Sequence, residues 1–348
     1  MSTDGGSGAV VAKVLAEATA AVQAVAMEAQ AESCGSARDV GSGARLAFGT
    51  TGRYHSAVSK LAGKVLVIVG GTSGLGLSAA RAFVAAGAQV VVVGRDRDKV
   101  TAVEKELGKS VIGLAADATD AKAAAAAIQI AVGNFGGFHG LYHVAGGSGR
   151  RQGDGPLHDI TDEGWHYTLN ENLTALFLSN RAAAQQFLKQ QSGGTVLNMS
   201  SVLGFSPSPA YFTAHAYAAA KAAVLGLTQS CAASYAAANI RFNVLAPALV
   251  ATPMSHRAQN DTDILDFIRT KQPLDGGRIG QPADCDGAAV FFMSDDSRFV
   301  TGQVLAVDGG WSVSEGQVPV RGMVREPAAA RSVWSRLGEM WGRIQPKK

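Results

Sequence analysis

A tyrosine and a lysine four residues apart are the side chains of this sequence best suited to proton transfer. Tyr217 and Lys221 lie in the Ala-rich segment AHAYAAAKAAVLGLTQS, which is predicted to be helical. Residues at this spacing share one face of a helix, so the ammonium group is expected beside the phenol. A neighbouring positive charge favours the tyrosinate and lowers a tyrosine pKa from about 10 toward neutral pH, as proton transfer requires. Without further context, the two residues would equally be an ordinary surface pair.

Two further polar side chains lie upstream of this pair. The segment TVLNMSSVLGF predicts a buried strand that ends at Ser200 and Ser201, and ligands bind at the carboxyl ends of strands in parallel sheets. Ser201 is a candidate to hydrogen-bond a substrate oxygen, with the capping of a turn or helix as its alternative role. Asn172 lies in the predicted helical run WHYTLNENLTALFL, where the pattern alone assigns it no chemistry.

A glycine-rich loop predicts a site for a dinucleotide. Gly70, Gly74 and Gly76 in VGGTSGLG follow a predicted strand and open a predicted helix. Such a loop turns tightly, lets its backbone approach phosphate oxygens, and points the helix N-terminus at a pyrophosphate. The loop residues between the glycines that are expected to contact the cofactor are Thr72, Ser73 and Leu75. A plain tight turn is the alternative.

The end of the second predicted strand bears on the identity of the cofactor. This strand ends VVVVGRD, where a Rossmann-type fold places the adenosine ribose. Arg95 offers a cation to a 2′-phosphate and Gly94 leaves room for it, so NADP(H) is favoured over NAD(H). The alternative is that Arg95 and Arg97 are solvated surface charges. Asp117, after the third predicted strand, is placed to reach the adenine amino group or to cap a helix beginning near Thr119.

The elements that must position these residues alternate along the chain. Continuous β-branched runs predict strands covered on both faces, separated by Ala-rich helices. The predicted strands are 65–69, 90–93, 110–115, 139–144, 195–200, 241–245 and 304–307. The predicted fold class is α/β, a Rossmann-type doubly wound parallel sheet in a single domain with extensions at both ends.

Bulk properties exclude several classes of protein. The chain has 348 residues, 42 of them Gly, and a formal charge of +3, which makes nucleic acid a poor partner. Cys34, Cys231 and Cys285 lie far apart without metal-ligand spacing, so free thiols and no metal are expected. Apolar runs are too short to span a bilayer, and the N-terminus lacks the pattern of a signal or transit peptide. A cytoplasmic location is therefore predicted.

Three regions are predicted: an Ala/Gly-rich extension over 1–60, the catalytic domain over 61–315, and a basic extension over 316–348. In the last region, apolar residues from Val333 to Ile344 recur at helical spacing opposite Arg331, Arg336 and Arg343. We expect this amphipathic helix to dock on the core or on a neighbouring subunit, with attachment to a membrane surface as the alternative.

Taken together, these motifs resemble the short-chain dehydrogenase/reductase family over about residues 61 to 312. The glycine loop, Asn172, Ser201 and the Tyr217/Lys221 pair are followed by IRFNVLAPALVATPM and FVTGQVLAVDGGW in the family's order. The resemblance implies a Rossmann-type fold, an NAD(H) or NADP(H) cofactor, and an Asn-Ser-Tyr-Lys tetrad. Tyr217 would be the general acid/base, Lys221 would bind ribose and lower the Tyr217 pKa, Ser201 would orient the carbonyl, and Asn172 would support a water-linked proton relay.

The resemblance also selects among neighbouring residues. Ser201 is chosen over Ser200 because the family's serine lies three residues before a glycine, here Gly204. Tyr211 is excluded because the residue four positions later is His215. Additional cofactor contacts are implied for Ala118, Ala145, Gly146, Pro247, Val250 and Thr252, besides the glycine loop, Arg95, Asp117, Tyr217 and Lys221.

The expected reaction interconverts a carbonyl and a secondary alcohol of a small-molecule substrate by hydride transfer. The resemblance further implies a homotetramer or homodimer. Two alternatives stay open at this point. One is a catalytically silent dinucleotide-binding regulator, and the other is an epimerase or dehydratase that uses the same tetrad.

Three positions depart from the family pattern. His143-Val144 replaces an Asn-Asn pair, so an amide that braces the sheet is missing, and His143 is either a buried structural residue or a substrate-binding one. Ala248 replaces a glycine, which alters the backbone near the nicotinamide, and Val69 replaces a threonine. Segments 147–158 and 249–278 are expected to border the substrate cleft. They supply both cations (Arg150, Arg151, His256) and apolar residues (Met254, Ile264, Leu265, Phe267), so the substrate stays unassigned.

Overall fold

The computed structural model describes residues 59–316, which contain a seven-stranded parallel sheet. The strands are β1 (Val65–Val69), β2 (Gln89–Gly94), β3 (Val111–Ala115), β4 (Gly140–His143), β5 (Gly194–Met199), β6 (Ile240–Pro247) and β7 (Val304–Val307). Their spatial order is β3-β2-β1-β4-β5-β6-β7, so the direction of winding reverses between β1 and β4. Ligands bind at such a switch point, outside the carboxyl ends of the strands. The predicted doubly wound fold is confirmed.

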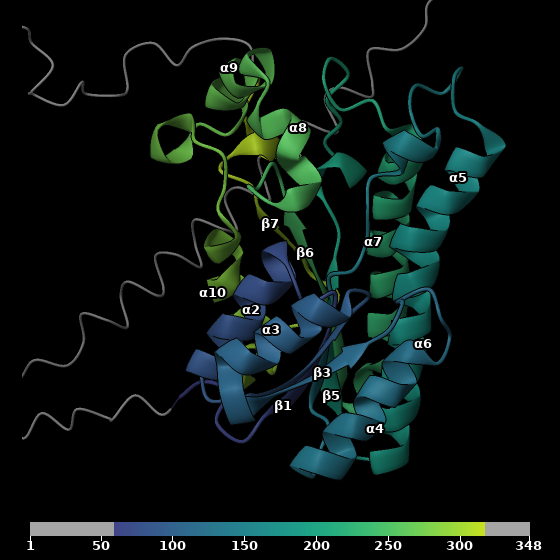
Figure 1. Ribbon diagram of the computed structural model, residues 1–348, viewed down its shortest axis with the longest axis vertical. Helices are drawn as coiled ribbons and strands as arrows, with labels where there is room; N and C mark the ends of the chain where they lie inside the picture. The colour runs from purple at the N-terminus through teal and green to yellow at the C-terminus, as the bar shows by residue number, and fades with distance from the viewer. Residues whose placement is uncertain (1–58, 317–348) are drawn as a thin grey trace, which may run out of the picture. The chain divides into compact units, whose positions relative to one another are not determined.

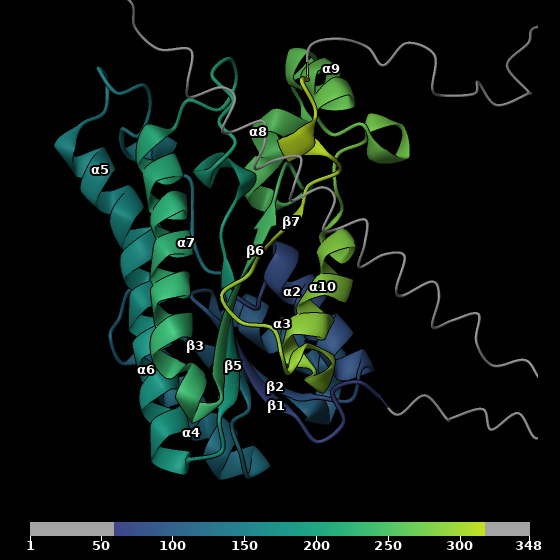
Figure 2. The same ribbon diagram turned by 180° about the vertical axis from the view of Figure 1, so that it is seen from behind.

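Helices cover both faces of this sheet (Figures 1 and 2). The helices of the described residues are α2 (Gly74–Ala85), α3 (Arg97–Leu107), α4 (Ala123–Phe135), α5 (Asp162–Leu169), α6 (Ala175–Gln190), α7 (His215–Tyr235), α8 (His256–Gln259), α9 (Thr262–Lys271) and α10 (Asp286–Met293). One core layer joins the sheet to α2, α3 and α10, and the other joins it to α4, α6 and α7.

The central strand β1 shows why the sequence adopts this arrangement. All five of its residues are buried. Successive side chains of a strand point to opposite faces, so Leu66 and Ile68 pack in the layer of α2, while Val67 packs in the layer of α4 and α6. A continuous apolar run is therefore required here, in contrast to the alternating pattern of a half-exposed strand.

A third, smaller core supports the segment that follows β6. It contains Ile264 and Ile268 of α9, both fully buried, together with Trp311 from the chain after β7. The Trp311 indole donates to the Ser206 carbonyl at 3.2 Å, and its ring meets that of Phe267 edge-on with centroids 5.7 Å apart. Figure 1 shows α8 and α9 at one end of the sheet, beyond β6 and β7. This layer, 249–278, is called the cap below.

Several predictions fall wholly or largely outside residues 59–316: the extension over 1–60, the basic amphipathic helix of 316–348, and Cys34. The boundaries at 60 and 316 stay predictions. Cys231 and Cys285 are free thiols. Within the described part of the chain, no helix has both the length and the apolar character needed to cross a membrane.

Candidate active site

The glycine loop between β1 and α2 forms a cradle lined by backbone. A side chain at Gly76 would collide with the Gly70 carbonyl oxygen, and one at Gly70 would come within 2.5 Å of the Ala145 nitrogen. Ser73 precedes α2 without capping it, and no acidic residue occupies the first turn of this helix. The first N–H groups of α2 are therefore available to phosphate oxygens. The loop fits the pyrophosphate of a dinucleotide.

Loops from other strands lie against this cradle. The Ala145 N–H, just after β4, donates to the Val69 carbonyl at 2.8 Å. A side chain on Gly74 would lie 3.3 Å from the Thr252 methyl group, so the loop after β6 lies on the glycine loop. The other predicted cofactor residues lie at the same sheet edge: Thr72 against Gly94, Leu75 in α2, Ala118 after β3, Gly146 after β4, Pro247 at the end of β6, and Val250 beside Gly280.

The ends of β2 and β3 bring charged groups together. The Arg95 guanidinium lies 3.9 Å from the Asp117 carboxylate and 3.5 Å from the carboxylate of Glu171. Asp117 also accepts two hydrogen bonds from Thr119, from its N–H and its hydroxyl, each at 2.8 Å. Asp117 therefore stabilises a turn at Thr119, which resembles its alternative role as a helix cap. It does not cap α4, because that helix begins only at Ala123. Sequence reasoning missed Glu171, because 76 residues separate it from Arg95.

Tyr217 and Lys221 lie together in the first turns of α7. The Lys221 ammonium lies 5.5 Å from the centroid of the Tyr217 ring and donates to the Met199 carbonyl, at the end of β5, at 3.1 Å. Only 3% of Lys221 is exposed. The Ser201 hydroxyl lies close enough to the Tyr217 phenol to lower its pKa. Three of the four predicted catalytic side chains thus meet at the carboxyl end of β5.

The two serines after β5 have different partners. Ser200 donates to the backbone carbonyl of Lys221 at 2.8 Å and so ties β5 to α7. Ser201 accepts from the Leu203 N–H at 3.2 Å, which is the predicted capping role, in addition to its contact with Tyr217. A side chain on Gly204 would come within 2.9 Å of the backbone at Lys221. The glycine three residues after Ser201 therefore lets the serine turn pack closely on α7.

Asn172 lies in a π-helical turn, Asn170–Thr174, between α5 and α6. Its side chain is fully buried and donates to the carbonyls of Gly147 at 2.8 Å and Thr168 at 2.9 Å. Its amide oxygen accepts from the Gly147 N–H at 3.2 Å. Asn172 thus fixes the loop after β4 beside the ammonium of Lys221, and π-helical turns are frequent at functional sites.

Burial dominates the electrostatics of the tyrosine-lysine pair. Burial raises the pKa of Tyr217 to about 12, although the nearby Ser201 hydroxyl acts to lower that pKa. Burial also lowers the pKa of Lys221 to about 8. The expected lowering of the tyrosine pKa by Lys221 is therefore not present in this arrangement. Burial and the nearby Ser201 hydroxyl account for the shift, and Lys221, whose ammonium donates to the Met199 carbonyl, does not contribute to it.

His143 is a buried structural residue. Its Nδ1 lies 3.0 Å from the Ser179 hydroxyl and its Nε2 lies 3.1 Å from the Ala145 carbonyl. Burial lowers the pKa of His143 to about 3, so the ring is neutral. Because a carbonyl only accepts, Nε2 carries the proton, and the Ser179 hydroxyl has both Nδ1 and the Ala175 carbonyl as acceptors at 3.0 Å for its single proton. The histidine therefore joins β4 to α6, and supplies the brace that the missing asparagine would provide.

A buried acid that sequence reasoning did not single out holds the start of α7 in place. Both carboxylate oxygens of Asp154 accept backbone N–H bonds at 3.0 Å, one from Ala216 and one from Tyr217. Asp154 is 5% exposed and belongs to the loop after β4. Its place between two glycines, in GDG, marks a turn, but the 62 residues to Ala216 conceal the contact.

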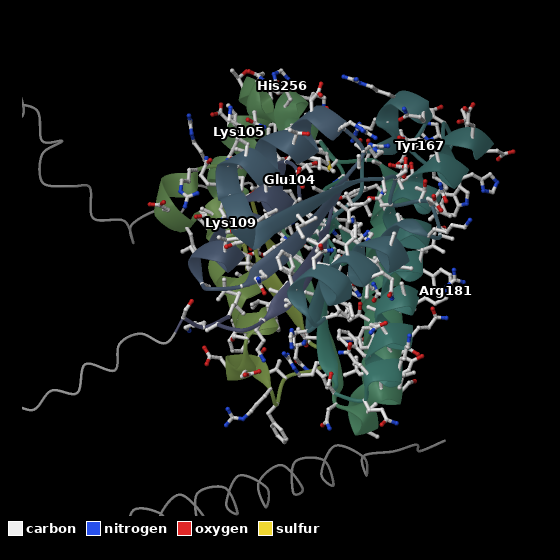
Figure 3. The ribbon with its side chains drawn as sticks, turned by 60° about the horizontal axis from the view of Figure 1, so that its bottom comes forward. Glu104, Lys105, Lys109, Tyr167, Arg181 and His256 are labelled. Atoms are coloured by element: carbon white, nitrogen blue, oxygen red, sulfur yellow. The ribbon has the colours of Figure 1, made fainter. Side chains whose placement is uncertain are left out.

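The two segments predicted to border the substrate cleft contain both cationic and apolar side chains. Arg150, Arg151 and His256 are exposed, and Figure 3 shows His256 pointing outward from the cap. Met254 is half-exposed, whereas Ile264 is buried in the core of the cap. The apolar residues of α9 thus hold the cap together more than they line its surface.

A family model described as Enoyl-(Acyl carrier protein) reductase matches residues 69–312. A relative from Dickeya dadantii, 2-dehydro-3-deoxy-D-gluconate 5-dehydrogenase, is 35% identical over 256 residues, which cover 72% of this chain and 96% of the relative.

Two solved structures share the fold. A short-chain type dehydrogenase/reductase from Mycobacterium ulcerans has a TM-score of 0.68 and 30% identity, over 74% of this chain and 92% of that one. The 3-ketoacyl-(acyl-carrier-protein) reductase from Brucella melitensis, complexed with NADH, has a TM-score of 0.64 and 28% identity, over 73% of this chain and 100% of that one. The chain is an oxidoreductase that acts on CH–OH groups with a nicotinamide dinucleotide, and it belongs to the short-chain dehydrogenase/reductase family.

Proposed function

We propose that this protein interconverts a carbonyl and a secondary alcohol on a small molecule, with NADP(H) preferred over NAD(H) and Tyr217 as the general acid/base. The observation that carries the proposal is the convergence of Ser201, Tyr217 and Lys221 at the carboxyl end of β5. The same edge of the sheet holds a glycine cradle that fits a pyrophosphate.

When bound, the nicotinamide would supply or accept the hydride. The glycine loop and the N-terminus of α2 would hold the pyrophosphate, and Asp117 would lie near the adenine. Lys221 would donate to ribose hydroxyls. Its ammonium makes one hydrogen bond, to the Met199 carbonyl, so its other N–H donors are available to the ribose. Arg95 would attract a 2′-phosphate.

The protein's own part in the chemistry is to hold and move one proton. In carbonyl reduction, the Tyr217 hydroxyl gives its proton to the substrate oxygen, and in alcohol oxidation the tyrosinate takes that proton back. A pKa raised to about 12 keeps Tyr217 protonated, which suits the reductive direction. Ser201 would donate to the same oxygen, while Asn172 and its loop would support a water-linked relay to Lys221.

The alternatives have less support. A silent regulator would have no need for Asn172, Ser201, Tyr217 and Lys221 all to be retained, and the similar proteins are named dehydrogenases or reductases. An epimerase or dehydratase would consume no net cofactor. A cytoplasmic location and a homotetramer or homodimer belong to the same proposal, and sedimentation measures the latter.

The test is NADPH oxidation across a panel of carbonyl compounds. The parent protein should turn over at least one compound, and Tyr217→Phe should lose at least about 10²-fold of that rate while still binding NADPH. Binding of NADPH without any turnover would refute the catalytic role. For the cofactor, Arg95→Ala should weaken NADPH and spare NADH, and equal parent affinities for the two would refute the preference.

A further inference from the structure

The guanidinium of Arg95 lies between two carboxylates at the sheet edge where the adenosine ribose is expected. Its Nη1 is 3.5 Å from the Glu171 carboxylate and 3.9 Å from that of Asp117. The Arg95 side chain is 63% exposed and that of Asp117 is 44% exposed, whereas only 12% of the Glu171 side chain is exposed. Glu171 is therefore the least solvated of the three groups.

The backbone of Glu171 is fixed by its neighbour. Asn172 is fully buried and is hydrogen-bonded to Gly147 and Thr168, so the π-helical turn that carries both residues is anchored to the loop after β4. From this turn Glu171 reaches across to the end of β2, 76 residues earlier in the chain. The carboxylate is thus held beside Arg95 by the tertiary structure.

An anion that binds Arg95 must compete with this carboxylate. A 2′-phosphate would have to share the guanidinium with Glu171 and would lie near its negative charge, whereas a 2′-hydroxyl carries no charge. We propose that Glu171 is a specificity-determining residue for the cofactor: by holding Arg95, it limits the preference for NADP(H) that Arg95 alone would give. This inference rests on the proposed role of Arg95 in binding the 2′-phosphate.

The same geometry makes the competition depend on pH. Burial raises the pKa of Glu171 above its usual value, with Asp117 acting in the same direction and Arg95 opposing it. Protonation of Glu171 at lower pH would remove its charge and release Arg95. The effect of Glu171 on NADPH binding should therefore be full at alkaline pH and fade as the pH falls.

Calorimetric titration with NADPH and NADH, in the absence of substrate, tests the proposal because the two ligands differ only in the 2′-phosphate. Glu171→Gln should bind NADPH about threefold to tenfold more tightly than the parent and bind NADH within about twofold of it. Glu106→Gln is the matched control, because Glu106 pairs with Arg81 on the exposed surface of α2 and α3 and its loss changes the net charge equally. The control should change neither affinity by more than about twofold.

Two results separate this inference from the proposal on which it rests. If Arg95→Ala weakens NADPH but Glu171→Gln binds both ligands as the parent does, or binds both more weakly, the role of Glu171 is overturned alone. If Arg95→Ala leaves NADPH unchanged, the phosphate role of Arg95 fails, and this inference fails with it.

A pH series adds a second measurement. The ratio of NADPH affinities between Glu171→Gln and the parent should shrink from about pH 8 to about pH 5, because the parent gains the neutral side chain that the variant always has. The 2′-phosphate also takes up a proton in this range, with a second pKa of about 6, which weakens its repulsion by Glu171 and shifts the ratio in the same direction. A constant ratio above one would show that the Glu171 charge is not the cause.

Discussion

Replacing Asp154 by alanine should loosen the helix that carries Tyr217, the proposed general acid. Both oxygens of this carboxylate accept N–H bonds at 3.0 Å, from Ala216 and from Tyr217 itself. Ala214, which precedes α7, supplies no side-chain acceptor, and the first turn contains no acidic residue. Asp154 therefore satisfies two of the backbone donors that a helix leaves open at its start.

The cost follows from these contacts. Loss of an N-cap costs about 0.5–2 kcal/mol, hydrogen bonds to a charged group contribute about 1.5–3 kcal/mol, and a carboxylate near a helix N-terminus adds up to about 2 kcal/mol. These contributions overlap, so we expect Asp154→Ala to lower the free energy of unfolding by about 2–3 kcal/mol. For a domain of this size, that corresponds to a melting temperature about 5–10 °C lower. Asp154→Asn keeps one acceptor oxygen and should lose about half as much.

Catalysis should suffer more than cofactor binding. One of the two donors is the N–H of Tyr217, so the freed turn carries the phenol, and a displacement of about 1 Å in a reacting group can cost about 10²-fold in rate. Lys221, one helical turn after Tyr217, keeps its hydrogen bond to the Met199 carbonyl. We therefore expect kcat of Asp154→Ala to fall about 10-fold to 10²-fold, with the Kd for NADPH within about threefold of the parent.

Thermal unfolding, steady-state kinetics and NADPH titration measure these effects. Ile128→Ala is the control, because Ile128 is buried in α4, which packs mainly on α6, β1 and β2, and its truncation should cost about 2–5 kcal/mol while kcat is kept. The reasoning is refuted if Asp154→Ala is destabilised but retains its kcat. It is also refuted if both variants lose kcat to the same extent well below their melting temperatures.

Three further predictions concern the buried groups of the site. Lys221→Met should abolish activity yet raise the free energy of unfolding at pH 7 by up to about 2–3 kcal/mol, because the lysine pKa is lowered to about 8. The folded state binds that proton less tightly than the unfolded state, so the gain should shrink between about pH 8 and pH 10.5 in chemical denaturation. His143→Asn should retain at least about half of kcat. It should also lose less stability than the parent between about pH 6.5 and pH 3, because in the parent the unfolded chain binds a proton at His143 that the buried ring, with a pKa of about 3, does not bind. Gly204→Ala should lower kcat by about tenfold or more, because its methyl group would press on the α7 backbone at Lys221, and unchanged kinetics would contradict this.

The fold could be predicted because local pattern and burial agree along most of the chain. The predicted strand 65–69 matches β1 residue for residue, since a run of five apolar residues is needed where both faces are covered. The glycine loop and the proximity of Ser201, Tyr217 and Lys221 were also predictable, because their spacings are local or belong to an ordered set of motifs.

Contacts between distant segments could not be predicted in the same way. Asp154 caps a helix 62 residues away and Glu171 reaches an arginine 76 residues away. Neither contact leaves a periodicity in the sequence. The error about the tyrosine pKa has a related origin. Helical spacing places Lys221 near Tyr217, but the direction of the ammonium depends on where β5 ends.

The burial of the Lys221 ammonium lowers the stability of the fold, and we interpret this loss as a consequence of its proposed role in binding the cofactor ribose. The ammonium is 3% exposed and its hydrogen bond goes to a carbonyl, and no carboxylate of residues 59–316 pairs with it. A carboxylate partner would raise the lysine pKa and stabilise the fold, but it would also occupy the donors that a ribose hydroxyl needs. A lone carbonyl leaves the remaining N–H donors available, at the expense of stability. Sites under selection for binding are expected to carry such locally unfavourable groups, which is why we predict a more stable and inactive protein when this lysine is replaced by methionine.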